Sequence, residues 1–262
     1  MPSFWENIRM PDPEEDRESG ANIAEAGDMA AYVSFPPPSA GTSLPAVIVV
    51  QEAFGANQHI QKVADGFAAA GFVAVAPALF HRNERNPNPM LGYTPEDFDA
   101  AINTYMPALT GQGIIADINA TVDYLQRTYP RTRGQKIGIV GYCMGGRVVY
   151  LAASSCSGLS AGVVYYGGAI LAPYSDGVTP IDGTANISIP LMGNFGETDG
   201  NPTPADVSQI EAALDAAGKS YDFKMYSGAG HGFNCNDRDS YNQAAADDAQ
   251  ARTVAFFNEH LK

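Results

Sequence analysis

The chain has 262 residues, of which 45% are hydrophobic and 17% are charged, and its formal net charge is −14. This composition is typical of a globular protein and excludes a fibrous repeat or a long disordered tail. An acidic surface repels phosphate backbones and anionic headgroups, so we expect neither nucleic acid nor a membrane as a partner. A chain of this length commonly folds as a single α/β domain.

The N-terminus and the cysteines predict a cytoplasmic protein. The chain begins Met-Pro-Ser-Phe-Trp-Glu-Asn, which is neither basic nor apolar enough for a signal peptide, and it contains no run of eighteen apolar residues. Its cysteines, Cys143, Cys156 and Cys235, form no CxxC pair, which suits thiols that stay reduced. The four histidines show no metal-ligand spacing, so we expect no metal and no cofactor.

The first part of the chain predicts a surface arm followed by the edge of a sheet. Residues 1–20 are polar and acidic and are expected to form the arm, which leaves residues 21–262 as the single domain. Two short runs, residues 23–25 and 29–35, are separated by a turn sequence and indicate a hairpin at a sheet edge.

Residues 45–79 predict a strand, a helix and a second strand. Residues 45–50 and 72–79 are unbroken apolar runs, which are typical of strands buried on both faces, and residues 57–70 have helical spacing. This order makes a right-handed βαβ unit in a parallel sheet, whose carboxyl-end loops converge on one edge. We expect the functional site at that edge.

Residues 81–108 are rich in proline and asparagine. Such a segment, here around residues 82–110, would overhang the carboxyl edge of the sheet as a lid or pocket wall. Within it, Thr94 followed by Pro, Glu and Asp indicates a helix start. Residues 170–188 form another long, polar segment, and the sequence alone does not place it.

The remaining segments continue the alternation of helices and strands. Helices are expected over residues 114–127, 204–217 and 243–261, and strands over 163–166, 189–195 and 221–226. The predicted fold class is therefore α/β, with a mostly parallel central sheet flanked by helices on both faces.

Residues 136–150, KIGIVGYCMGGRVVY, predict a strand, a sharp turn and a helix. The turn carries the nucleophile-elbow pattern Gly-x-Cys-x-Gly, with Cys143 at its tip, and Gly141 and Gly145 allow strand and helix to approach closely. The helix N-terminus would favour the thiolate of Cys143. A free cysteine is more often a small buried hydrophobe, so the catalytic interpretation depends on partners elsewhere.

Those partners follow in the chain. A thiol nucleophile needs a base, and the base needs an acid that orients it. His231 follows the last predicted strand and Asp199 the strand before it, which is the order found in α/β-hydrolases. Glu197 or Asp206 could be the acid instead. The other histidines do not fit this order and are interpreted as packed or solvated: His59, His81 and His260.

Two main-chain amides are expected to form an oxyanion hole. They belong to Met144, directly after the nucleophile, and to Ala53, in the loop after the strand at 45–50. Glu52 beside Ala53 would repel the developing charge unless it is neutralised. It either points away as a structural acceptor or takes part in proton transfer around Cys143.

Four stretches together resemble the dienelactone hydrolase family of α/β-hydrolases: QEAFG at 51–55, GYCMGG at 141–146, ETD at 197–199 and AGHGF at 229–233. The resemblance covers residues 22–260 and implies an α/β-hydrolase fold with ester or lactone hydrolysis. By the same resemblance, Cys143 is the nucleophile, Asp199 and His231 are its partners, and Glu52 is the glutamate that contacts the resting thiol and helps to ionise it.

The resemblance also implies substrate contacts. Arg82 looks like one of the family's arginines that grip a substrate carboxylate, and Phe54 and Tyr142 are the other expected contacts. Members that cleave dienelactone carry an arginine where this chain has Cys235. The missing contact would weaken carboxylate binding by about 1.5 to 3 kcal/mol, which disfavours dienelactone itself as the substrate.

Arg238 or Arg147 could supply the missing charge from elsewhere in the chain. The sequence therefore predicts a cysteine hydrolase for a small ester or lactone, with or without a carboxylate, in a monomer or a homodimer. A general carboxylesterase or thioesterase is the alternative among enzymes. Outside enzymes, the alternatives are a ligand-binding module and a thiol redox sensor on the same scaffold.

Overall fold

A central β-sheet organises the computed structural model, which describes residues 1–10 and 28–262. The sheet has eight strands in the order β1-β2-β4-β3-β5-β6-β7-β8. The strands are β1 (Ser3–Ile8), β2 (Met29–Ser34), β3 (Ala46–Val50), β4 (Val73–Pro77), β5 (Ile137–Tyr142), β6 (Ala161–Tyr165), β7 (Leu191–Gly196) and β8 (Tyr221–Tyr226).

The six strands from β4 to β8 in the sheet order pair in parallel, and β1 and β2 add an antiparallel edge. The helices are α1 (Gln58–Ala69), α2 (Pro95–Ala100), α3 (Gly111–Asp123), α4 (Met144–Ser155), α5 (Pro204–Ala216) and α6 (Gln243–Leu261). A mostly parallel sheet with alternating helices confirms the α/β-hydrolase architecture expected from the sequence. Among the helices that the structure describes, none is long and apolar enough to cross a bilayer.

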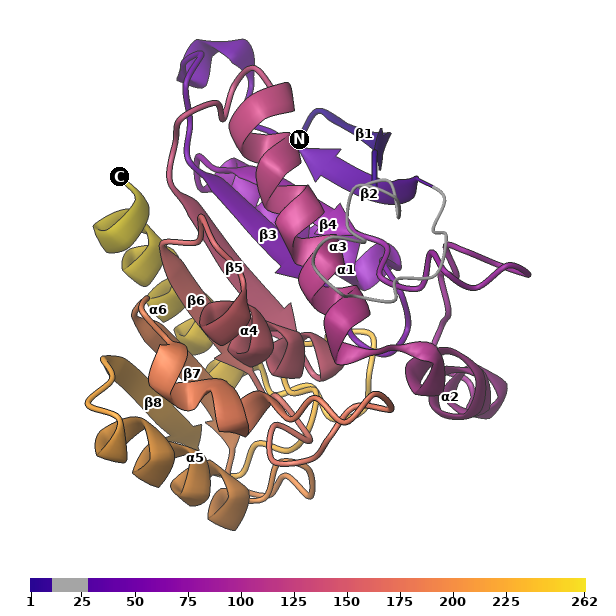
Figure 1. Ribbon diagram of the computed structural model, residues 1–262, viewed down its shortest axis with the longest axis vertical. Coiled ribbons are helices and arrows are strands. Elements are labelled where there is room, and N and C mark those ends of the chain that lie inside the picture. The colour runs from indigo at the N-terminus through magenta and orange to yellow at the C-terminus, as the bar shows by residue number, and fades with distance from the viewer. Residues whose placement is uncertain (11–27) are drawn as a thin grey trace.

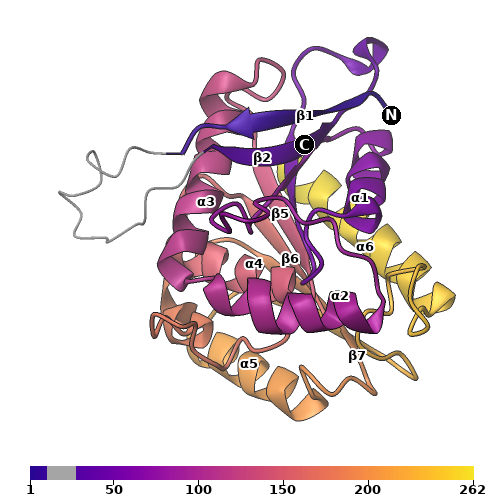
Figure 2. The ribbon, with the colours of Figure 1, turned by 90° about the vertical axis from the view of Figure 1, so that its right-hand side faces the viewer.

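Helices cover both faces of the sheet (Figure 2), where α3 and α4 lie on one side of it and α1 and α6 on the other. The alternation of side chains along β3 shows why both faces must be covered. Ile48 and Val50 belong to the core cluster shared with α3, α4 and α5, whereas Val47 and Val49 belong to the one shared with α1 and α6. Successive residues of a strand point to opposite faces, so a continuous apolar run needs two cores.

The N-terminal arm is one point where the structure differs from the sequence analysis. Ser3–Ile8 pairs with β2 as the edge strand β1, and Ile8 is buried. Trp5 packs edge-on against Tyr32 at a centroid distance of 5.7 Å. A polar alternating strand at a sheet edge looks like a solvated segment in the sequence because one of its faces is wet. The other half of the expected hairpin, residues 23–25, lies outside the described residues.

The segment predicted as a lid or pocket wall contains α2. Thr94 caps this helix in a reciprocal capping box with Asp97, as the sequence indicated. The helical path then continues through a π-helical turn, Ala101–Tyr105, and a 3₁₀ turn, Met106–Ala108. Figure 1 shows α2 beyond the arrowhead of β3, so the segment stands at the carboxyl end of the sheet.

Two further segments can be compared with the sequence expectations. Residues 170–188, which the sequence did not place, include a 3₁₀ stretch, Pro180–Asn186, that packs on α4 through a 2.7 Å hydrogen bond between the Tyr150 and Thr184 hydroxyls. The helix predicted over residues 114–127 is present as α3, followed by a π-helical turn, Tyr124–Thr128.

Candidate active site

The turn between β5 and α4 is the sharp elbow that the sequence predicted. Cys143 stands alone between the two elements with φ 56° and ψ −117°. A Cβ on Gly141 would lie 2.0 Å from the Gly145 carbonyl oxygen, and one on Gly145 would lie 2.6 Å from the Val50 carbonyl oxygen. Side chains are therefore excluded at both glycines, because strand, helix and the neighbouring β3 are in backbone contact.

The positive φ of Cys143 is strained for a residue with a Cβ, at a cost of roughly 1 to 3 kcal/mol. Two backbone hydrogen bonds hold it in place. The Cys143 amide donates to the Tyr165 carbonyl at 3.1 Å, and the Cys143 carbonyl accepts from the Gly146 amide at 2.9 Å. The result is a half-buried thiol presented at the carboxyl edge of the sheet, at the N-terminus of α4.

His231 joins this thiol to a buried carboxylate. Its Nδ1 lies 2.9 Å from Oδ2 of Asp199, which is 4% exposed. The other oxygen of Asp199 accepts the Asn201 amide at 2.8 Å, so the carboxylate is fixed at both ends. Burial is the largest influence on the pKa of His231 and lowers it, but the charge and hydrogen bond of Cys143, together with Asp199, raise that pKa to about 10.

The two alternative acids have other partners. Glu197 accepts from the Ser227 hydroxyl at 2.6 Å and from the Gly228 amide at 3.1 Å, and it is exposed. Asp206 caps α5 through Thr203. Of the three carboxylates considered in the sequence, Asp199 is the one whose oxygen contacts His231.

A cavity of about 420 Å³ opens onto these groups. Cys143, Asp199 and His231 line it together with the residues expected to supply the oxyanion hole, Ala53 and Met144. Its remaining walls are largely apolar, with two arginines at the margin: Phe54, Phe98, Ile102, Met106, Arg147, Gly168, Ala169, Gly200, Asn201 and Arg238. The segment around α2 therefore provides one wall, through Phe98, Ile102 and Met106.

The amides of Ala53 and Met144 are available to an oxyanion. Met144 is the first residue of α4, so its N–H has no acceptor within the helix. The Ala53 amide has no hydrogen-bond acceptor among the residues that the structure describes. Both residues line the cavity beside Cys143, which is where the negative oxygen of a tetrahedral intermediate would form.

Glu52 is buried, at 1% exposure. Its Oε1 accepts from the Tyr166 hydroxyl at 3.4 Å and lies 3.8 Å from Arg238 Nη1. Within the described residues, no hydrogen bond joins Glu52 to Cys143. The contact with the resting thiol that the family resemblance implied is therefore not made through a hydrogen bond between the described residues, and the positive group beside Glu52 is Arg238.

The substrate contact expected for Arg82 is wrong. Its guanidinium forms a two-point ion pair with Asp117 at 2.6 and 2.7 Å, and it is not among the residues that line the Cys143 cavity. Asp117 is fully buried on α3 and also lies 3.0 Å from His81 Nε2. A buried carboxylate needs a counter-charge, so the arginine that the sequence assigned to substrate is used to attach the β4 loop to α3.

Of the other two residues expected to contact substrate, one lines the cavity and one does not. Phe54 lines the cavity, and its ring packs edge-on against Phe98 at a centroid distance of 4.8 Å. Tyr142 does not line it: the side chain is fully buried in the core shared with α1 and α6, with its ring 4.6 Å from that of Tyr165. Tyr142 is the residue before the nucleophile and still belongs to β5, so strand alternation directs it away from the tip.

Two arginines do reach the cavity. The Arg238 guanidinium lies 5.6 Å from the Phe98 ring centroid and 5.8 Å from that of Phe54. The Arg147 guanidinium lies 3.5 Å from the Tyr174 ring and donates to the Ala172 carbonyl at 2.7 Å. Sequence reasoning named both as substitutes for the missing family arginine, and the structure places both at the cavity margin.

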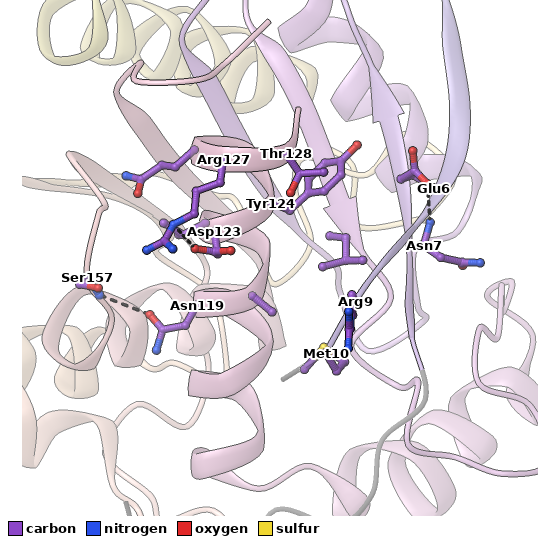
Figure 3. Close-up of a pocket in the computed structure, with 14 residues that line it drawn as sticks. Glu6, Asn7, Arg9, Met10, Asn119, Asp123, Tyr124, Arg127, Thr128 and Ser157 are labelled. Carbon is purple, nitrogen blue, oxygen red and sulfur yellow. Dashed lines mark hydrogen bonds and ion pairs between the residues drawn. The ribbon is translucent and has the colours of Figure 1, made fainter. Parts of the chain in front are cut away.

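A second, larger cavity of about 680 Å³ lies between β1 and the helical segment that begins with α3 (Figure 3). Its polar lining includes the ion pair Arg127–Asp123 and the Glu6 side chain. None of the described residues around it is a histidine or a cysteine. Its described lining therefore lacks the thiol and imidazole that line the cavity at Cys143.

Comparison with known proteins identifies the family of this chain. Residues 29–261 match the model of the Dienelactone hydrolase family. The chain belongs to this family. Its fold and hydrolase class, an enzyme acting on ester bonds, are those that the sequence motifs predicted.

Relatives named "Putative carboxymethylenebutenolidase" occur in Synechocystis and Escherichia coli. The first is 37% identical over 86% of this chain and 90% of its own length. The second is 32% identical over 91% of this chain and 86% of its own. A crystal structure titled "Putative Dienelactone Hydrolase" from Klebsiella pneumoniae superposes with a TM-score of 0.79 at 27% identity, covering 99% of this chain and 100% of that one.

Proposed function

We propose that this member of the dienelactone hydrolase family is a cysteine-nucleophile hydrolase of small esters or lactones, with Cys143, His231 and Asp199 as its triad. The observation that carries the proposal is the position of His231, hydrogen-bonded to a buried carboxylate and interacting with a thiol on a strained elbow. An imidazole whose pKa is raised to about 10 by its interactions with Cys143 and Asp199 holds a proton at neutral pH, which it can give to a leaving alkoxide.

The reaction proceeds in two halves. The Cys143 thiolate attacks the carbonyl carbon, and the displaced electron pair resides on the oxygen held by the Ala53 and Met144 amides. Collapse expels the alkoxide, which takes the proton from His231, and leaves a thioester on Cys143. Water then attacks the thioester while His231 accepts its proton, so acid is released and the starting ion pair is restored. Asp199 holds the imidazole in the required tautomer.

The walls of the cavity indicate the kind of substrate. Phe54, Phe98, Ile102 and Met106 offer an apolar surface on one side, which suits an unsaturated or aliphatic body. Arg238 brings a cation to the same space, and its carboxylate neighbour Glu52 is 3.8 Å away rather than in close contact. The combination suits a small acid that carries an ester or lactone bond, with its carboxylate directed at Arg238.

Turnover of a small aryl ester tests the triad. Wild type should hydrolyse it, and Cys143→Ala and His231→Ala should each lower kcat/KM by at least about a thousandfold, because triad members act as a unit. Cys156→Ala is the matched control, since Cys156 is a half-buried thiol outside the cavity, and it should leave turnover unchanged.

The rival interpretations give other outcomes. A thiol redox sensor would react with peroxide at Cys143 and hydrolyse nothing, and a binding module would bind the ester without product. Activity that survives in either triad variant would overturn the proposal. A general carboxylesterase or thioesterase would hydrolyse the ester but show no preference for substrates with a free carboxylate.

A further inference from the structure

Three buried side chains that the mechanism does not use meet beside the cavity: Glu52, His59 and Cys235. One ligand atom from each, a carboxylate oxygen, an imidazole nitrogen and a sulfur, lies within 4.8 Å of the other two. The side chains come from the loop after β3, the first turn of α1 and the loop after His231. Their residues are 1%, 4% and 0% exposed.

Two atoms of this cluster lack hydrogen-bond partners. Oε2 of Glu52 and Nε2 of His59 are both buried, and among the described residues neither has a partner. A buried polar atom without a partner is costly, so a carboxylate and an imidazole placed together for packing alone would be expected to bond each other. The thiol of Cys235 donates a hydrogen bond to the Tyr93 hydroxyl at 3.2 Å.

We propose that Glu52, His59 and Cys235 form a binding site for a borderline-soft divalent metal ion of the zinc class. Carboxylate, imidazole and thiolate are the three ligand types that zinc takes in proteins, whereas magnesium and calcium require oxygen throughout. The mixed set therefore selects zinc, or cobalt as its spectroscopic substitute, over the hard ions.

The spacing is close to what such an ion needs. Ligand atoms bound tetrahedrally at about 2.0 to 2.3 Å lie roughly 3.5 Å from one another. The cluster limit of 4.8 Å is wider by about an ångström, which side-chain rotation can close. Three protein ligands leave a fourth position, to which the Tyr93 hydroxyl is the neighbouring protein group.

The charges of the cluster and its surroundings fix how the ion would bind. Glu52 Oε1 is shared by Tyr166 and by Arg238 at 3.8 Å, so the unpartnered Oε2 is the oxygen that remains for the metal. Binding releases the thiol proton of Cys235 to solvent, and the two resulting anions match the double charge of the ion. The positive Arg238 lies on the other carboxylate oxygen and lines the catalytic cavity, which places the metal site behind that side chain.

The sequence alone gave no sign of this site. The three ligands are separated by 7 and by 176 positions, so no short spacing motif appears, and the four histidines considered by themselves showed no pattern. The three side chains come together only in the folded protein, where the loop that carries Cys235 lies beside the start of α1.

Metal titration of the full-length protein, first stripped with a chelator, tests the proposal. Calorimetry with zinc chloride should give one equivalent of binding in wild type. Cys235→Ser and His59→Gln should each weaken it by more than about tenfold, since even outer partners of a metal site contribute about 10- to 100-fold. Cys156→Ser should bind zinc as wild type does. Thermal melts recorded in chelator show whether each variant is folded before metal is added.

A double variant makes the result independent of whether the cluster variants fold. Cys143→Ala with Cys156→Ser leaves Cys235 as the sole cysteine of the chain. Cobalt added to this protein should give thiolate-to-cobalt charge-transfer absorption, which only Cys235 can then supply. Absence of that absorption would overturn the proposal. Zinc binding that disappears in Cys143→Ala and persists in Cys235→Ser would place the ion on the catalytic thiol and would overturn it equally.

Discussion

Two arginine–carboxylate pairs near the carboxyl edge of the sheet are built from similar parts and differ in tightness. Arg82 grips Asp117 at two points, 2.6 and 2.7 Å, whereas Arg238 approaches Glu52 at 3.8 Å. Both carboxylates are buried, at 0% and 1% exposure. The tight pair lies outside the catalytic cavity, and the arginine of the loose pair lines it.

The difference separates a structural charge from one that can bind substrate. A two-point guanidinium–carboxylate contact uses the fork of donors that a substrate carboxylate would need. Arg238 keeps most of that capacity free, and its aromatic neighbours Phe54 and Phe98 hold the guanidinium in place without using its donors. This difference supports the proposal that the loosely paired Arg238 binds the substrate carboxylate.

Replacing Arg82 should give the largest effect, and on stability rather than on activity. Arg82→Gln leaves Asp117 buried with one remaining partner, His81, and breaking a buried ion pair costs about 3 to 5 kcal/mol. Urea unfolding measures the loss. The kcat/KM per folded molecule should change little, and a selective loss of activity toward carboxylate substrates with normal stability would return substrate binding to Arg82.

Replacing Arg238 should give the reverse result. Arg238→Gln removes a charge-assisted contact worth about 1.5 to 3 kcal/mol, so kcat/KM for a lactone or ester with a free carboxylate should fall about 10- to 100-fold. The methyl ester of the same substrate should be little affected. Arg85→Gln, at an exposed position on the α2 segment, is the control. Equal losses for the acid and the methyl ester would remove the distinction between the two arginines.

Prediction from sequence succeeded for features that depend on local patterns in the chain. The parallel sheet, the elbow and the order of Cys143, Asp199 and His231 depend on local patterns: apolar runs, glycines forced by backbone contact, and strand ends that share one edge. Such patterns are present in the sequence because the physical constraint acts over a few residues. The structure brings Asp199 and His231 together at 2.9 Å in the manner that chain order suggested.

Prediction failed where the outcome depends on a distant partner. Nothing near Arg82 in the chain announces that Asp117, 35 positions later, is buried beside it. In the same way, Tyr142 follows strand alternation into the opposite core although it adjoins the nucleophile, and β1 becomes a strand only because β2 offers it an edge. Long-range pairing determines whether a polar side chain serves the fold or the substrate.

A third buried carboxylate, Asp199, differs from Asp117 and Glu52 because its partner, His231, can lose its positive charge as the pH rises. The pKa of His231 is about 10 in the folded protein against about 6.5 when unfolded, so the folded state binds this proton more tightly. The stabilisation is fully present below about pH 6.5 and is lost as the pH rises through about 10. Between pH 7 and 10, the unfolding free energy of wild type should therefore fall more steeply than that of His231→Gln.

The arginine-held Asp117 gives the matched reference, since a guanidinium keeps its charge throughout this range. In Arg82→Gln, the pH slope between 7 and 10 should equal that of wild type, although the protein is less stable at every pH. Parallel slopes for wild type and His231→Gln would mean that the imidazole carries no extra proton in the folded state. The protonated imidazole that the proposed mechanism uses to expel the alkoxide would then be absent.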